Sequence, residues 1–127
     1  MFDIKLASKQ HSNHKTIVKI GDEFIGKEEL CLIAGPCAVE SERQLDEIAK
    51  GISDLGIKFM RGGAYKPRTS PYAFQGLKKE GLKLLKEASK KYDLKIVTEV
   101  LDTTLIEEAY SYADIFQVGS RNAKNYQ

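Results

Sequence analysis

One short segment of the chain collects side chains that bind anions. Residues 61–72 contain Arg61, Lys66, Arg68 and Thr69 together with two glycines, and they begin where an apolar run that predicts a β-strand ends. Guanidinium and ammonium groups, hydroxyls and free backbone amides gathered at a strand end are suited to holding phosphate. The segment therefore predicts an enzyme that handles phosphorylated sugars or acids.

A second candidate is Cys37, which follows a Gly-Pro turn at the end of a predicted strand over residues 31–34. A lone cysteine is commonly an inert small apolar residue, but its place beside a polar cluster equally favours a metal-binding thiolate. A cysteine nucleophile would need a histidine base, and His11 and His14 both lie in the polar N-terminal segment, where surface positions are expected. Cys31 falls inside the predicted strand and is assigned to the core.

Two later strand ends also carry polar side chains. Glu99 lies near the end of a predicted strand over residues 95–100, where an acid–base role and a structural hydrogen bond both remain open. Arg121 follows a predicted strand over residues 115–118. Because the carboxyl ends of parallel strands converge on one face of an α/β barrel or sheet, we expect these side chains to meet Cys37 and the cationic segment.

The elements that must position these groups alternate along the chain. Residues 1–15 are expected to be a loose tail, and residues 16–30 a β-hairpin with its turn at Gly21-Asp22. Four strands and three helices then follow in strict alternation, which predicts an α/β fold with parallel strands and right-handed crossovers. The predicted strands are residues 31–34, 57–61, 95–100 and 115–118.

Helix ends are marked by capping residues. Ser41 with Gln44 predicts a capping box at the start of the first helix, and Gly56 predicts its end. Thr104 with Glu107 predicts a second capping box before the last helix. The predicted buried face of the first helix consists of Leu45, Ile48, Ala49, Ile52 and Leu55.

Composition and charge exclude several classes of protein. The chain of 127 residues has a net charge of only +2, which argues against a nucleic-acid partner. Two cysteines are too few for a secreted disulfide framework, so a reducing cytoplasm is expected. No membrane partner is expected either, because residues 1–10 lack the apolar core of a signal peptide and no stretch is long enough to span a bilayer.

Four segments together resemble 3-deoxy-D-arabino-heptulosonate 7-phosphate (DAHP) synthases of type I, in the subclass that is also similar to 3-deoxy-manno-octulosonate 8-phosphate (KDO8P) synthases. The matching segments are residues 34–41, 61–76, 97–100 and 116–122. The sequence Lys66-Pro67-Arg68-Thr69 separates the two groups, since KDO8P synthases carry a loop of the Lys-Ala-Asn-Arg-Ser type there.

The resemblance implies a (β/α)8 TIM barrel and the first step of the shikimate pathway, which leads to aromatic amino acids. In that transferase reaction phosphoenolpyruvate (PEP) condenses with erythrose 4-phosphate, phosphate is released, and a divalent metal of the manganese, iron, zinc or cobalt class is required. It implies Cys37 as a metal ligand. Lys66, and Glu99 from its place at a strand end, are the candidate catalytic residues. The substrate-binding residues that it implies are Arg61, Lys66, Pro67, Arg68, Thr69 and Arg121.

Length limits what the chain can contain. A complete barrel takes about 250 residues, so residues 31–127 are expected to form a first half-barrel of about four strands. The family's other metal ligands, a histidine and two carboxylates, are not matched here. We therefore expect the isolated chain to lack condensation activity, and its unpaired strand edges to favour a homo-oligomer or association with a complementary half. KDO8P synthase activity, or a non-catalytic half-barrel that binds phosphate weakly, are the alternatives.

Overall fold

The chain divides between Cys31 and Leu32 into two units, and the computed structural model describes residues 8–124. In the first unit, β1 (Val18–Ile20) and β2 (Glu23–Ile25) pair antiparallel around a tight turn, which confirms the predicted hairpin. Of the predicted tail, residues 8–15 contain no helix or strand, and residues 1–7 lie outside the described part. Cys31 is half-buried and precedes the first parallel strand, so its assignment to a strand core was wrong.

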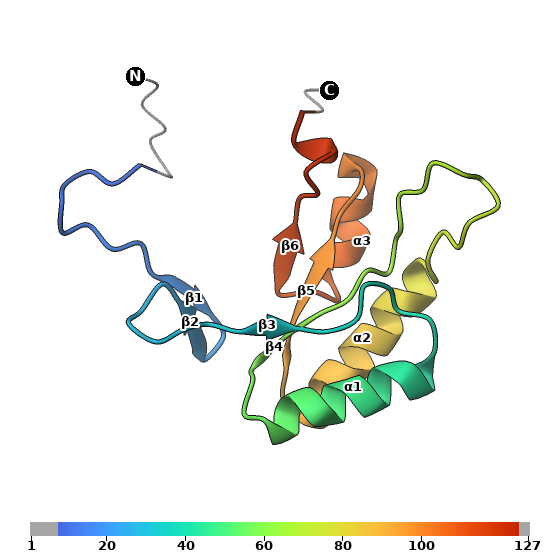
Figure 1. Cartoon of the computed structure of the whole chain (residues 1–127), viewed down its shortest axis with the longest axis horizontal. Coiled ribbons are helices and arrows are strands. Elements are labelled where there is room, and N and C mark those ends of the chain that lie inside the picture. Colours follow the sequence, from blue (N-terminus) through green and yellow to red (C-terminus); the bar gives the residue numbers. More distant parts are fainter. Residues whose placement is uncertain (1–7, 125–127) are drawn as a thin grey trace. The chain divides into compact units, whose positions relative to one another are not determined.

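The second unit contains a parallel sheet of four strands in chain order (Figure 1). Its strands are β3 (Ile33–Ala34), β4 (Phe59–Arg61), β5 (Lys95–Glu99) and β6 (Ile115–Gln117). The helices are α1 (Glu42–Asp54), α2 (Lys79–Tyr92) and α3 (Ile106–Tyr110), with short 3₁₀ turns η1 (Thr103–Leu105) and η2 (Asn122–Lys124). The predicted alternation of strands and helices is confirmed, although each strand is shorter than predicted.

The strand register separates the two faces of this sheet. Because side chains alternate along a strand and paired residues in a sheet point to the same side, Met60 and Ile96 share one face, and Arg61 and Val97 share the other. Met60 and Ile96 belong to the core that the three helices cover. The opposite face, which carries Arg61, Glu99 and its register partner Gln117, therefore points away from the helices.

The core lies between the sheet and its helices. Leu45 and Ala49 of α1, and Leu82 and Leu85 of α2, are almost completely buried. Gly81, which the helical pattern alone marks as a weak point, is buried against Ala64, and an added Cβ would lie 3.1 Å from the Ala64 Cβ. This glycine therefore lets α2 approach the segment that follows β4.

Capping at the start of α1 agrees with the sequence in most details. The Ser41 hydroxyl accepts from the Gln44 backbone N–H at 3.2 Å, as predicted. The Gln44 side chain accepts instead from the N–H of Glu40, one residue before the cap. Gly56 ends the helix with φ of +73°, but Leu55 is exposed at the cap, so its predicted burial was wrong.

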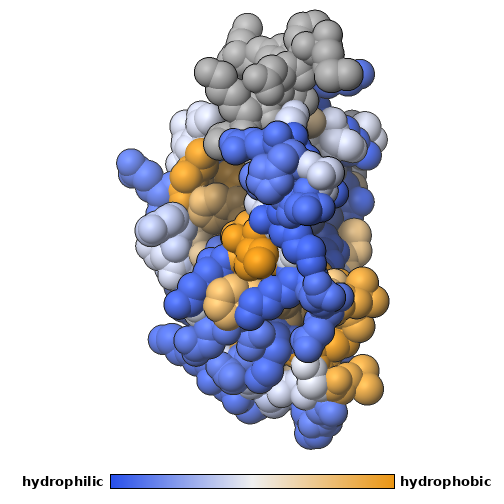
Figure 2. Space-filling view, turned by 90° about the vertical axis from the view of Figure 1, so that its left-hand side faces the viewer, coloured by the Kyte–Doolittle hydropathy of each residue, from blue (hydrophilic) through white to orange (hydrophobic). Residues whose placement is uncertain are grey.

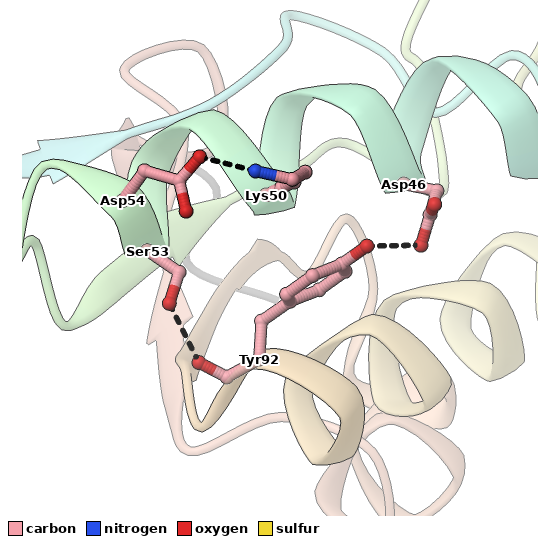
Figure 3. Close-up of polar contacts among 5 residues, drawn as sticks. All are labelled: Asp46, Lys50, Ser53, Asp54 and Tyr92. Atoms are coloured by element: carbon pink, nitrogen blue, oxygen red, sulfur yellow. Dashed lines mark hydrogen bonds and ion pairs between the residues drawn. The ribbon is translucent and has the colours of Figure 1, made fainter.

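Helices α1 and α2 are joined by polar contacts across their outer surface (Figure 3). The Tyr92 hydroxyl donates to Asp46 at 2.8 Å, and the Ser53 hydroxyl donates to the Tyr92 carbonyl at 3.3 Å. Lys91 pairs with the same Asp46 carboxylate. The hydrogen bonds from Lys91 and then from Tyr92 lower the pKa of Asp46, so this carboxylate stays ionised at neutral pH.

The predicted capping box at Thr104 was wrong. Asp102 is the capping residue, and its carboxylate accepts from both the backbone N–H and the hydroxyl of Thr104. The cap therefore lies two residues earlier and opens η1, after which α3 is a short helix of 5 residues. Two neighbouring polar residues that can both cap a helix explain the misplacement, since Asp and Thr are both favoured at such positions.

Large apolar side chains are exposed at both edge strands of the four-stranded sheet. Leu32 and Ile33 at β3, and Val118 after β6, are each about half exposed or more. On the side of the molecule that Figure 2 shows, apolar patches lie among hydrophilic side chains. Within residues 32–124, β3 and β6 each pair with one strand only. No helix within residues 8–124 is both long enough and apolar enough to cross a lipid bilayer.

Two glycines provide a matched test of this backbone. Gly76 has φ of +90°, and an added Cβ would lie 2.1 Å from the Ala64 carbonyl oxygen, whereas Gly51 is in α1 with no neighbour within 4 Å. We expect Gly76→Ala to lower the free energy of unfolding by about 1–3 kcal/mol, and Gly51→Ala to raise it by about 0.5–1 kcal/mol. Urea denaturation followed by circular dichroism measures both. Equal effects of the two substitutions would contradict the described path of residues 65–77.

Candidate active site

A cavity of about 540 Å³ lies on the helix-free side of the sheet, at the carboxyl ends of its strands. Its charged lining consists of three cations, Lys66, Arg68 and Arg121, and one carboxylate, Glu99. The described residues that line it are Cys37, Lys66, Pro67, Arg68, Glu99, Leu101, Gln117, Gly119, Ser120, Arg121 and Asn122. The excess of positive charge suits an anionic ligand.

Lys66 connects the segment after β4 to the turn after β3. Its Nζ donates to the Cys37 carbonyl at 3.0 Å and lies 3.5 Å from the Cys37 Sγ. The side chain is only 9% exposed, although it carries an ammonium group. Gly63 makes room for it, because a Cβ at this position would lie 2.9 Å from the Lys66 Cδ.

The electrostatic surroundings of Cys37 favour its thiolate. The hydrogen bond and charge of Lys66 lower the pKa of the thiol most, and the more distant charges of Arg61 and Arg68 lower it further, while desolvation acts in the opposite direction. Cys37 is exposed and unpaired. A thiolate that is accessible beside cations can act as a metal ligand or react with electrophiles.

Arg61 supports the Cys37 turn from the end of β4. Its guanidinium NH1 donates to the Pro36 carbonyl at 2.5 Å. Gly35 has φ of +145°, and an added Cβ would lie 2.0 Å from the Arg61 carbonyl oxygen. Only glycine fits this close approach, so contact with β4 restricts position 35 to glycine.

Backbone hydrogen bonds close the base of the loop that carries the cations. The Lys66 N–H donates to the Gln75 carbonyl at 2.9 Å, and the Lys78 N–H donates to the Ala64 carbonyl at 2.8 Å. The Arg68 Nε donates to the Phe74 carbonyl at 3.3 Å. These bonds hold the two ends of the loop 66–75 together, so Lys66 and Arg68 are presented by a compact loop.

Glu99 packs on the turn that follows β6. A Cβ at Gly119 would lie 2.0 Å from the Glu99 Oε1, so this position excludes larger residues while Glu99 keeps its place. The Asn122 side chain donates to the Leu101 carbonyl at 3.0 Å and ties the same turn to the end of β5. Residues from the ends of β5 and β6 thus form one wall of the cavity.

Most residues singled out from the sequence meet in this cavity. Cys37, Lys66, Pro67, Arg68, Glu99 and Arg121 all line it. Arg61 and Thr69 do not: the Arg61 guanidinium is engaged by Pro36, and Thr69 lies in the exposed part of the loop. Sequence reasoning missed Gln117, Ser120 and Asn122, although their position at the carboxyl end of β6 was the available signal.

The described residues do not by themselves form a metal site. Within residues 8–124, no group of three or more His, Cys, Asp or Glu side chains converges as metal ligands would. Cys37 offers one thiolate, and the Lys66 ammonium lies 3.5 Å from its sulfur. One donor does not define a coordination geometry, so a metal held in a fixed position here would need ligands from outside residues 8–124.

Comparison with known proteins decides the family. The sequence profile described as the DAHP synthetase I family matches residues 4–127. The chain belongs to this family. The phospho-2-dehydro-3-deoxyheptonate aldolase of Thermotoga maritima is 48% identical over 123 residues, which are 97% of this chain and 36% of that protein. A 2-dehydro-3-deoxyphosphooctonate aldolase of Fusobacterium nucleatum is 35% identical over 80% of this chain and 39% of its own length.

Solved structures of the DAHP synthetase I family have the same fold. The DAHP synthase of Thermotoga maritima superposes with a TM-score of 0.83 at 50% identity, over 87% of this chain and 32% of that one. A truncated form of the same enzyme gives a TM-score of 0.76 at 45% identity. The chain thus spans somewhat more than a third of the curated relatives' length. Its four parallel strands are part of a TIM barrel, as predicted.

The contact between Lys66 and Cys37 can be tested by thiol reactivity. In a Cys31→Ser background, the pH at which iodoacetamide alkylates Cys37 at half its maximal rate should lie below that of a free cysteine peptide, because nearby cations stabilise the thiolate. Lys66→Met should move this pH upward and slow alkylation at pH 7.

Lys90→Met, which removes an exposed cation from the last turn of α2, is the matched control and should leave the alkylation profile unchanged. An unchanged alkylation profile in Lys66→Met would contradict the contact.

Proposed function

We propose that this chain supplies the first part of the active site of a DAHP synthase, which condenses phosphoenolpyruvate with erythrose 4-phosphate and releases phosphate. The observation that carries the proposal is the cavity where Lys66, Arg68 and Arg121 meet Glu99 and Cys37 at the carboxyl ends of the strands. Membership of the DAHP synthetase I family supports it. The reaction would be the first step of the shikimate pathway to aromatic amino acids.

The charges of the cavity match the charges of the substrates. PEP carries a phosphate and a carboxylate, and erythrose 4-phosphate carries a second phosphate. Three cations in one cavity can neutralise these groups, and charge-assisted hydrogen bonds to them contribute about 1.5–3 kcal/mol each. Arg68 and Arg121 offer planar guanidinium groups that bind phosphate or carboxylate with two hydrogen bonds, while Lys66 acts as a point charge.

We assign PEP to Lys66 and Arg121, and the phosphate of erythrose 4-phosphate to the loop Lys66-Pro67-Arg68-Thr69. The hydrogen bonds at the base of this loop support the assignment, because a loop that is already ordered loses little conformational entropy when a ligand binds. Arg61 is proposed to act indirectly: its hydrogen bond to the Pro36 carbonyl supports the turn that carries Cys37, and its charge lowers the pKa of the Cys37 thiol. Holding both substrates in one cavity brings C3 of PEP to the aldehyde carbon.

Among residues 8–124, Glu99 is the one carboxylate that lines the cavity, so we propose that it handles a proton of the condensation or orients Lys66 toward PEP. Cys37 is proposed as one thiolate ligand of a divalent metal whose remaining ligands come from outside residues 8–124. The isolated chain, with one such donor, is therefore expected to bind anions without turning over substrates. A cytoplasmic location is proposed as well, because Cys31 and Cys37 are both unpaired.

A DAHP synthase is favoured over a KDO8P synthase by similarity in sequence, and the two reactions differ in the acceptor that they require. A seven-carbon product combines the three carbons of PEP with a four-carbon aldehyde, whereas an eight-carbon product needs a five-carbon aldehyde. The relative named for a seven-carbon product is more similar to this chain, at 48% identity, than the octonate aldolase at 35%. The Lys66-Pro67-Arg68-Thr69 loop supports the same choice.

Strand edges suggest how the site is completed. Within residues 32–124, β3 and β6 each have one unpaired edge, and apolar side chains are exposed beside them. We propose that further strands pair at these edges, from additional polypeptide or from a second copy of the chain, because exposed edges promote such pairing.

Binding of PEP tests the proposal on the chain as it stands. Isothermal titration calorimetry should detect PEP binding at low ionic strength, and Lys66→Ala with Arg121→Ala should weaken it at least tenfold, since each removes a charge-assisted contact to PEP. Replacing the exposed Lys83 and Lys90 of α2 by alanine is the control with equal loss of charge and should have little effect. If the two double variants lose the same affinity, binding reflects net charge and the proposed site is wrong.

A further inference from the structure

We propose that Glu108 of α3 is a positioning residue for Lys66 and acts through the hydroxyl of Tyr65. The inference rests on the proposed function, because it concerns how the cation assigned to PEP is held. Tyr65 directly precedes Lys66, whereas Glu108 lies 43 residues after Tyr65, in α3. Neither residue lines the cavity.

One carboxylate joins three elements of the second unit. The Tyr65 hydroxyl donates to the Glu108 Oε2 at 2.7 Å. The other oxygen of Glu108 pairs with the Lys79 Nζ at 3.0 Å. Lys79 is the first residue of α2, and Tyr65 belongs to the segment after β4. Glu108 therefore links α3 to the segment after β4 and to the first residue of α2.

Ionisation favours this arrangement at neutral pH. The hydrogen bonds from Tyr65 and from Lys79 lower the pKa of Glu108, which keeps the carboxylate charged. Burial, followed by the hydrogen bond and charge of Glu108, raises the pKa of Tyr65 to about 12, so the phenol keeps its proton and remains a donor. A phenol that donates to a carboxylate makes a charge-assisted bond, which is stronger than a neutral one.

The backbone around Tyr65 couples the position of the Tyr65 side chain to that of Lys66. The neighbours of Tyr65 are already tied, since the Ala64 carbonyl accepts from Lys78 and the Lys66 N–H donates to Gln75. Tyr65 packs against the core, and its hydroxyl reaches Glu108. The Lys66 side chain lines the cavity, where its Nζ meets Cys37. A shift of the Tyr65 ring would therefore move the base from which the Lys66 side chain extends.

Such a contact could instead serve stability alone, and the two roles differ in what they change. A positioning role predicts a local effect at Lys66 and a loss of ligand affinity that depends on Lys66. A purely structural role predicts that every buried amide exchanges faster and that affinity falls whether Lys66 is present or not. Amide hydrogen exchange by NMR separates these outcomes, because it reports each backbone N–H individually.

The experiment compares Tyr65→Phe and Glu108→Gln with the parent chain. Tyr65→Phe removes only the hydroxyl, and the exchange rate of the Lys66 amide should rise about tenfold, as expected for the loss of a hydrogen bond to a charged group. Glu108→Gln keeps an acceptor but loses the charge, so its effect should be smaller. The buried residues Leu85 and Ile96 should keep their amide protection in both variants. Affinity for PEP should fall about fivefold in Tyr65→Phe.

Two controls complete the design. Glu80→Gln removes a surface carboxylate of α2 that pairs with Lys83, and should leave the Lys66 amide and the affinity for PEP unchanged. In a Lys66→Gln background, Tyr65→Phe should cause no further loss of affinity. Unchanged exchange at Lys66, equal acceleration at Leu85 and Ile96, or a full fivefold loss in the Lys66→Gln background would each overturn the proposal. If the parent does not bind PEP, the proposed function fails, while the exchange rates still decide the positioning role.

Discussion

The arrangement of the candidate site depends on one buried ammonium group. Lys66 is almost completely shielded from solvent, and its Nζ is held by the carbonyl of Cys37 and lies beside the thiol. Burial of a charge is costly unless an opposite charge or several acceptors compensate for it. Here a carbonyl and a thiol whose pKa is lowered provide part of that compensation. The remainder is available to an anionic ligand, which is why this lysine is both a structural link and a binding group.

The rest of the second unit serves this contact. Three glycines permit it: Gly35 lets the Cys37 turn touch β4, Gly63 leaves room for the Lys66 stem, and Gly76 lets the loop return to Ala64. Arg61 and Tyr65 then hold the two partners of this contact: Arg61 bonds to Pro36 beside Cys37, and Tyr65, beside Lys66, bonds to Glu108. The helix-covered face of the sheet supplies stability, while the opposite face and the strand ends carry the polar groups. Such a division is typical of TIM barrels.

Local signals in the sequence were enough to predict the alternating elements and the strand ends where polar residues gather. Ser41 and Gly56 mark the ends of α1 because capping and positive φ are properties of short segments. The exposure of Leu55 could not be predicted from helical spacing, since the helix ends just before it. The contact of Tyr65 with Glu108 and the engagement of Arg61 by a carbonyl depend on residues 25 or more positions apart. Only the tertiary fold determines which of many possible partners these side chains meet.

The most direct test of the account is the location of anion binding on the 127-residue chain. A ¹⁵N-labelled sample titrated with PEP should give chemical-shift changes at Cys37, Lys66, Arg68, Ser120 and Arg121, because these residues line one cavity. The lysine-rich outer surface of α2, with Lys83, Lys86 and Lys90, should remain unaffected. Changes confined to that surface, or spread evenly over all cations, would contradict the claim that the strand ends form a phosphate-binding site.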